Sequence, residues 1–144
     1  MPGQTIIVHN LVQARTAIDF AISTHVEIEL RSPSGGGKNL GPGIFKAIVD
    51  EIEKLYPENA IIMILDCGSD AGLAMSALRR GCRDICIQVS DEVEVKIRAI
   101  ASALSANIHT RNKFELDLGC TGGTTKTDVR EINSLLCAHF DEAQ

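Results

Sequence analysis

Residues 60–81 read AIIMILDCGSDAGLAMSALRRG, and this stretch decides the predicted fold. Its first six residues, 60–65, are all apolar, which is typical of a strand buried on both faces of a parallel sheet. The segment from Asp66 to Asp70 predicts a turn, after which apolar residues recur at helical spacing from Leu73 to Leu78. Gly81 then ends the helix. A strand followed by a helix of this length is the repeating unit of an α/β protein.

The same alternation of strand and helix continues in both directions along the chain. We expect further strands at 5–9, 26–30, 84–89 and 107–110, and further helices after Asn10, near Pro42, after Ser90 and near Val129. The predicted apolar faces of these helices include Ile22, Ile44, Leu55 and Leu104. Residues 113–118 alternate apolar and polar side chains and predict an edge strand, joined to the strand before it by a hairpin turn at 111–112. Glycine and threonine dominate 119–127, which predicts a flexible connector.

These elements predict an α/β fold: a three-layer, doubly wound and mostly parallel sheet of five or six strands, of the flavodoxin-like or Rossmann-like kind. A half-barrel of β/α units, completed by dimerisation, would give the same local pattern and is the structural alternative. With 144 residues the chain is long enough to bury a core, so we expect residues 1–144 to form one domain.

The composition argues against nucleic acids and membranes as partners. The net charge is -5 and aromatic residues make up 3%, so the chain lacks both the basic surface and the stacking rings that nucleic acids require. Its first residues lack the pattern of a signal peptide, and the longest apolar stretch, 60–65, is too short to cross a bilayer. Five cysteines without Cys-x-x-Cys spacing favour reduced thiols, so we expect a cytoplasmic protein with no metal site.

A glycine-rich loop from Arg31 to Gly43 follows the second predicted strand. It is not a P-loop, because Gly37-Lys38 is followed by Asn39 and because Ser32 stands where the first glycine is required. Glycines still allow the backbone to approach a ligand closely, and the amides of the next helix attract a small anion. The residues expected to bind this ligand are Arg31, Ser34, Gly35, Gly36, Gly37, Lys38 and Ser69. The alternative is a mobile surface loop in which the glycines serve only its turns.

Asp66 is the candidate catalytic residue. It lies at the carboxyl end of the most apolar strand, and ligands of open parallel sheets bind beyond the carboxyl ends of the strands. There it would act as a general acid or base, with Arg31 and Lys38 stabilising charge. The alternative is a turn or cap residue that accepts hydrogen bonds from the amides of the next helix. Cys67 is a candidate nucleophile, with a histidine across the sheet edge, His9 or His109, as its base.

The run Leu65-Asp-Cys-Gly-Ser-Asp-Ala-Gly72, continued by Ala77-Leu-Arg-Arg-Gly81 and Ile85-Cys-Ile87, resembles the Leu-Asp-His-Gly segment of class II aldolases. That segment also ends a barrel strand and leads through a helix of small residues to a glycine and another strand. The resemblance covers only this middle part of the chain. It implies that Asp66 matches the catalytic acid and that Cys67 replaces the histidine that binds zinc.

A second resemblance covers other parts of the chain. The spacing of Leu30-Arg-Ser-Pro33, Leu40-Gly-Pro-Gly43 and Asp66-Cys-Gly68, followed by Ala71-Gly-Leu-Ala74, resembles small bacterial α/β proteins. This resemblance implies no function.

Two functions are compatible with these patterns. The first is binding of a small anionic metabolite, phosphorylated or carboxylated, at the carboxyl edge of the sheet, with lyase or transferase activity as the chemistry it would support. The second is a non-catalytic regulatory or interaction module, in which the loop and Asp66 are structural and an exposed helix or edge strand forms a homodimer. Neither a cofactor nor a substrate can be identified from the sequence.

Overall fold

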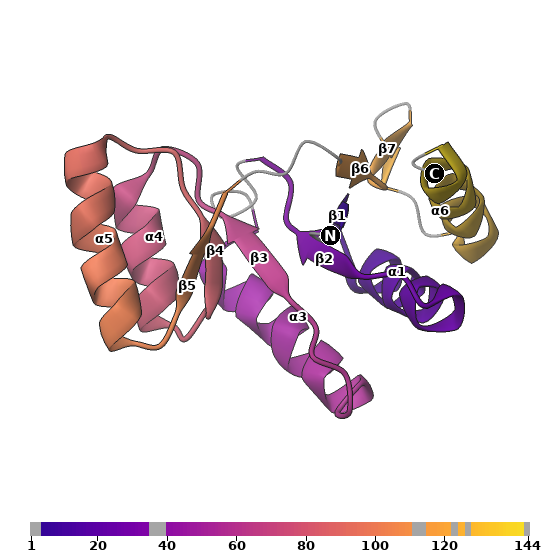
Figure 1. Cartoon of the computed structure of the whole chain (residues 1–144), viewed down its shortest axis with the longest axis horizontal. Coiled ribbons are helices and arrows are strands. Elements are labelled where there is room, and N and C mark those ends of the chain that lie inside the picture. Colours follow the sequence, from indigo (N-terminus) through magenta and orange to yellow (C-terminus); the bar gives the residue numbers. More distant parts are fainter. Residues whose placement is uncertain (1–3, 35–39, 111–114, 122–123, 126–127, 143–144) are drawn as a thin grey trace. The chain divides into compact units, whose positions relative to one another are not determined.

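The structure of the chain, a computed structural model, describes residues 4–34, 40–110, 115–121, 124–125 and 128–142 (Figure 1). Its elements are β1 (Gln4–Ile7), α1 (Leu11–Thr24), β2 (Ile28–Arg31), α3 (Pro42–Leu55), β3 (Met63–Asp66), α4 (Ala71–Arg79), β4 (Asp84–Cys86), α5 (Asp91–Ala103), β5 (Asn107–His109), β6 (Glu115–Asp117), β7 (Cys120–Thr121), β8 (Thr124–Thr125) and α6 (Val129–Glu142). Parallel strands flanked by helices confirm the predicted α/β fold and agree with a flavodoxin-like or Rossmann-like class. No helix within the described ranges is long and apolar enough to cross a membrane.

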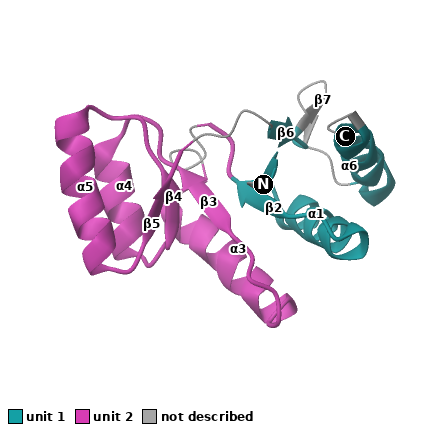
Figure 2. Ribbon diagram, in the orientation of Figure 1, with its two compact units in different colours: residues 1–31, 112–144 teal, residues 32–111 magenta. Residues whose placement is uncertain are grey.

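The chain divides into two compact units, which Figure 2 colours separately. Unit 1 consists of residues 1–31 and 112–144, and it contains β1, β2, β6, α1 and α6. Unit 2 consists of residues 32–111, and it contains β3, β4 and β5 with α3, α4 and α5. Unit 1 is therefore built from two segments that are separated in the sequence by the whole of unit 2.

In unit 1, β1 is the central strand of a parallel sheet, with β2 on one side and β6 on the other. Ile7 is in register with Arg31 of β2 and with Asp117 of β6. Because successive side chains of a strand point to opposite faces, this register sorts the side chains into two sets. The apolar face carries the buried residues Ile6, Val8, Leu30 and Leu118. The polar face carries Thr5, Glu29, Arg31, Glu115 and Asp117, with Ile7 among them.

Helices α1 and α6 contact each other and contribute to the core of unit 1. Asn10 caps α1 as predicted, since its Oδ1 accepts a hydrogen bond from the backbone N–H of Gln13 at 2.8 Å. The buried apolar residues of α6 are Ile132, Leu136 and Phe140. Phe20 of α1 meets Phe140, with ring centroids 5.4 Å apart. The predicted last helix is thus confirmed, and its apolar stripe faces α1.

The predicted hairpin between the fifth and sixth strands is wrong. β6 pairs with β1, and the pairing is parallel, with Glu115 in register with Thr5. Residues 111–112, the predicted turn, lie outside the described residues. The alternation of apolar and polar residues located the strand but carried no information about which neighbour it joins. Within the predicted connector, the described residues form a short antiparallel pair, β7 with β8.

In unit 2 the parallel strands lie in the order β3-β4-β5, which is also their order in the sequence. Helix α4 contacts both α3 and α5. The predicted ends of two helices are confirmed. Gly81 follows α4 with a φ of 88°, a left-handed conformation that glycine adopts without strain, and α3 ends at Leu55, before Pro57.

Four residues predicted on buried helix faces are exposed: Ile22, Ile44, Leu55 and Leu104. Each lies in the first or last turn of its helix or at its cap. Helix α3 has 14 residues and is about 21 Å long, whereas a strand of 4 residues such as β3 spans about 13 Å. The helices are therefore longer than the strands they cover, so helical spacing overestimates burial at their ends.

Candidate functional site

The predicted anion-binding residues have different environments. Gly35, Gly36, Gly37 and Lys38 lie outside the described residues, so this part of the prediction stays a prediction. Ser34 and Ser69 belong to unit 2 and are exposed. Arg31 belongs to unit 1 and is buried, with 2% of its surface exposed. A buried arginine is uncommon and requires a partner, so Arg31 is the starting point for the site.

The polar face of the unit 1 sheet contains three pairs of side chains that come from different strands or their extensions. The pairs are Thr5 with Glu29 at 2.7 Å, Arg31 with Glu115 at 2.8 Å and His9 with Asp117 at 2.6 Å. Thr5 and Arg31 are almost entirely buried, so the middle of this face is shielded from water. Buried polar groups need hydrogen-bond partners to offset their desolvation, and these pairs supply part of what this face needs.

The side chain of Arg31 reaches across the sheet. Arg31 belongs to β2 and Glu115 to β6, and β1 lies between these strands, so the guanidinium passes over β1 to meet the carboxylate. Only Nη1 takes part in this ion pair. Nε and Nη2 are buried and have no hydrogen-bond partner in the part of the chain that the structure describes. Leaving a buried donor without a partner costs roughly 1–3 kcal/mol.

His9 follows β1 and is held by three neighbours. Its backbone N–H donates to Oε1 of Gln13 at 2.8 Å, and its Nε2 pairs with Oδ1 of Asp117. The same carboxylate oxygen accepts the backbone N–H of Gly119 at 2.7 Å. A Cβ atom on Gly119 would overlap the imidazole of His9, so this close approach requires glycine. A carboxylate on one ring nitrogen orients the imidazole, which is the arrangement found in histidines that transfer protons.

Asp66 closes the turn between β3 and α4. Its Oδ1 accepts the backbone N–H of Gly68 at 2.9 Å, and its own backbone N–H donates to Oγ of Ser32 at 2.9 Å. The cap of α4 is a different residue, Asp70, whose Oδ1 accepts the N–H of Leu73 at 3.0 Å. These bonds are those of a turn residue, the alternative interpretation of Asp66. Asp66 belongs to unit 2, whereas Arg31 belongs to unit 1.

The thiol of Cys67 is poorly suited to act as a nucleophile. Burial, together with the neighbouring Cys82 and Asp66, raises its pKa to about 12. Burial also raises the pKa of Cys82 above its usual value. A thiol with such a pKa stays protonated at neutral pH, and the thiolate is the reactive form. The hypothesis of a nucleophilic Cys67 is therefore disfavoured.

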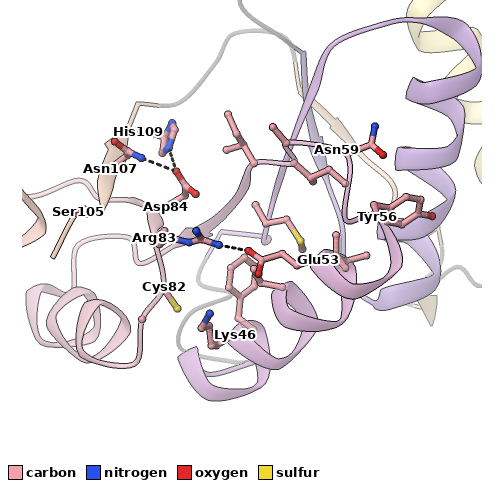
Figure 3. Close-up of a pocket in the computed structure, with 18 of the residues that line it drawn as sticks. Lys46, Glu53, Tyr56, Asn59, Cys82, Arg83, Asp84, Ser105, Asn107 and His109 are labelled. Atoms are coloured by element: carbon pink, nitrogen blue, oxygen red, sulfur yellow. Dashed lines mark hydrogen bonds and ion pairs between the residues drawn. The ribbon is translucent and has the colours of Figure 1, made fainter.

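Unit 2 contains a pocket of about 640 Å³ that the sequence did not predict (Figure 3). One face of α3, the residues leading into β3, and the residues around β4 and β5 line it. Figure 3 shows His109, Asn107 and Asp84 close together at one end of this pocket. Nε2 of His109 lies 2.7 Å from Oδ1 of Asp84, and Nδ2 of Asn107 donates to the same oxygen at 3.4 Å. The pocket thus combines an apolar wall with a polar end.

Sequence reasoning named both histidines but missed their partners. His9 and Asp117 are 108 residues apart, and His109 and Asp84 are 25 residues apart. The available signal was the alternation of polar residues in the sixth strand, where Glu115 and Asp117 had to share a face. That alternation could not show which strand lies beside it, and the pairs depend on that neighbour.

Among the residues with described positions, no group of three or more His, Cys, Asp or Glu side chains is arranged to hold a metal ion. In comparisons with known proteins, no family model matches the chain and no curated protein matches it. The function must therefore be inferred from the geometry of the chain itself.

Proposed function

We propose that this protein binds a small anionic molecule through the guanidinium of Arg31. The observation that carries the proposal is that Nε and Nη2 of this buried side chain have no hydrogen-bond partner among the described residues. Nε–H and one N–H of Nη2 are parallel donors, and they match the two oxygens of a carboxylate or the edge of a phosphate. A carboxylated or phosphorylated ligand would satisfy both donors at once.

The same face of the sheet offers a group for proton transfer. His9 lies two residues beyond Ile7, which is in register with Arg31, and Asp117 orients its imidazole. In this proposal Arg31 fixes the anionic group of the ligand and His9 accepts or donates a proton. Lyase or transferase chemistry on a phosphorylated or carboxylated metabolite would use both roles.

The test is the thermal stability of the protein in phosphate, succinate or chloride at equal ionic strength. A ligand at 100 times its Kd stabilises the folded state by about 2.7 kcal/mol, which corresponds to a rise in Tm of several degrees. We expect phosphate or succinate to raise the Tm of the wild type beyond the value in chloride. Arg31→Lys keeps the charge but lacks the parallel donors, so it should lose this rise.

Arg98→Lys is the matched control, because Arg98 is half-exposed and pairs with Glu94 on the same helix. This variant should keep the specific rise in Tm. If the wild type shows no rise beyond that in chloride, or if Arg31→Lys keeps it, the anion site does not exist. Arg31 and Glu115 would then serve only to connect β2 and β6 across β1.

A further inference from the structure

The pocket of unit 2 has the dimensions and the layout of a ligand site. Its volume of about 640 Å³ falls within the range of roughly 300–1,000 Å³ that small-molecule sites occupy. Its apolar wall includes Phe45, Val49 and Ile52 of α3 together with Met63. Three of its polar residues, His109, Asn107 and Asp84, lie together at the end formed by β4 and β5, as Figure 3 shows. Apolar walls with a few convergent polar groups are typical of sites that bind and orient small molecules.

The two cationic side chains that line the pocket are paired with carboxylates, Lys46 with Asp50 and Arg83 with Glu53. The carboxylate of Asp84 lies 2.7 Å from Nε2 of His109. Lys46 and Arg83 contribute two positive charges to the lining, and Glu53 and Asp84 contribute two negative charges. The lining is therefore balanced, and a charged ligand would lose hydration there without gaining an unpaired counter-charge.

We infer that this pocket binds an uncharged small molecule with an apolar body and a head that donates a hydrogen bond. The body would lie against Val49, Ile52 and Met63, and the head would face Asp84. A hydroxyl or a primary amide provides such a head. This ligand class differs from the anion proposed for Arg31, and the two sites lie in different units. Either proposal can therefore fail without the other.

The carboxylate of Asp84 selects the head. Its Oδ1 lies within hydrogen-bond distance of His109 Nε2 and accepts from Asn107 Nδ2. A carboxylate has two oxygens with about four acceptor positions, so Asp84 can also accept an N–H or O–H of a ligand. His109 and Asn107 hold the carboxylate in place, which limits the entropy lost when the ligand binds.

The test uses four probes that share a naphthalene body and differ in their heads. 2-Naphthalenemethanol and 2-naphthamide are uncharged, 2-naphthoate is an anion, and 2-naphthalenemethylamine is a cation at neutral pH. Each is titrated into the full 15N-labelled chain while NMR follows the backbone amides of Val49, Asp84 and Asn107. We expect the uncharged probes to shift these amides saturably and the charged probes to bind roughly tenfold more weakly, because their charge is desolvated without compensation.

A matched pair of substitutions on α3 locates the site. Val49→Phe fills the pocket and should abolish binding of the uncharged probes. Ala47→Phe adds the same ring at an exposed position of the same helix and should leave binding unchanged.

A second pair tests the charge argument and does not depend on Val49→Phe folding. Glu53→Gln leaves Arg83 without its carboxylate, so the affinity for 2-naphthoate should rise. Glu51→Gln removes the same charge from an exposed position that does not line the pocket, and it should change nothing. Equal affinities for all four probes, absence of binding, tightest binding of the cation, or unchanged 2-naphthoate affinity in Glu53→Gln would each overturn the inference.

Discussion

The two units each contain a histidine–aspartate pair built on the same plan. In both, the histidine lies two residues beyond the position that is in register with the aspartate on the neighbouring parallel strand. The distances are 2.6 Å for His9 with Asp117 and 2.7 Å for His109 with Asp84. Parallel pairing with this offset brings a histidine of one strand next to an aspartate of another.

The surroundings of the two pairs differ. The pair in unit 1 shares its face with Arg31, a buried cation that has two donors without a partner among the described residues. The pair in unit 2 lines a pocket in which the positive and negative side chains balance. A histidine–aspartate pair alone therefore leaves the charge of a ligand open. If the surrounding charges decide it, as we propose, the two sites should select ligands of different charge.

The largest expected effect comes from Arg31→Met. This substitution leaves Glu115, whose side chain is 24% exposed, without its guanidinium, so the free energy of unfolding should fall by about 3 kcal/mol. Arg31→Met/Glu115→Gln removes both charges and should recover most of that loss. Urea unfolding of the three proteins measures the difference. A double variant as unstable as Arg31→Met would show that Arg31 does more than balance Glu115.

Gly119→Ala should separate the two histidine–aspartate pairs. The added methyl group forces the His9 ring away from Asp117, at a cost of about 1 kcal/mol in stability, while His109 is unaffected. NMR spectra of the imidazole nitrogens report each ring separately. Gly72→Ala is the control, because it lies in α4 with room for a methyl group and should stabilise the protein by about 0.5 kcal/mol. An unchanged His9 signal in Gly119→Ala would contradict the described contact.

Replacing the two aspartates compares the pairs directly. Asp84→Asn should lower the free energy of unfolding by about 1 kcal/mol, and Asp117→Asn should lower it by less. The reason is that the Asp84 side chain is 19% exposed, whereas the Asp117 side chain is 52% exposed. Thermal unfolding of both variants at low and high salt provides the measurement. The effect of Asp117→Asn should shrink more with salt, since exposed pairs are screened. A larger loss of stability in Asp117→Asn than in Asp84→Asn would contradict this expectation.

Cys67 is expected to have no effect on the pH dependence of stability near neutrality and an effect only in alkali. Its pKa of about 12 in the folded chain exceeds its ordinary value of 9.0, so the unfolded chain loses the proton first. The stability that the buried thiol contributes is fully present below pH 9 and is lost as the pH rises toward 12. The unfolding free energy of Cys67→Ala should therefore decline less steeply than that of the wild type between pH 8 and 11. Cys137→Ala, at an exposed position, should follow the wild type.

Much of the fold could be predicted because its signals are local. The cap residue Asn10, the helix stop Gly81 and the proline at the start of α3 act within a few residues of themselves, so a single sequence displays them. The partner of β6 could not be predicted, because parallel strands are joined across long stretches of chain. The ends of a strand also depend on the neighbour to which it is hydrogen-bonded. The predicted strands were therefore too long, whereas their order along the chain was correct.

The site was less accessible to sequence reasoning because it depends on register. Arg31 was predicted to hold an anion from an open loop, whereas it lies at the end of β2 and is buried. Arg31 meets Glu115 because β1 lies between β2 and β6 in the sheet. No local sequence pattern shows this order of strands. The pocket of unit 2 depends on how α3 packs near β4 and β5, which requires the shapes of many side chains at once.

The division of unit 1 into two segments has a consequence for how the protein is made. On the ribosome, β1 and β2 are synthesised before residues 32–111, whereas β6 and α6 follow them. Unit 2 is continuous and pairs strands in sequence order, so its contacts are local and can form early. Until β6 is synthesised, one edge of β1 stays open to other strands, and Arg31 has no Glu115 to meet. The nascent chain is thus expected to be most prone to aggregation just before Glu115 emerges. The guanidinium of Arg31 stays without this carboxylate until then.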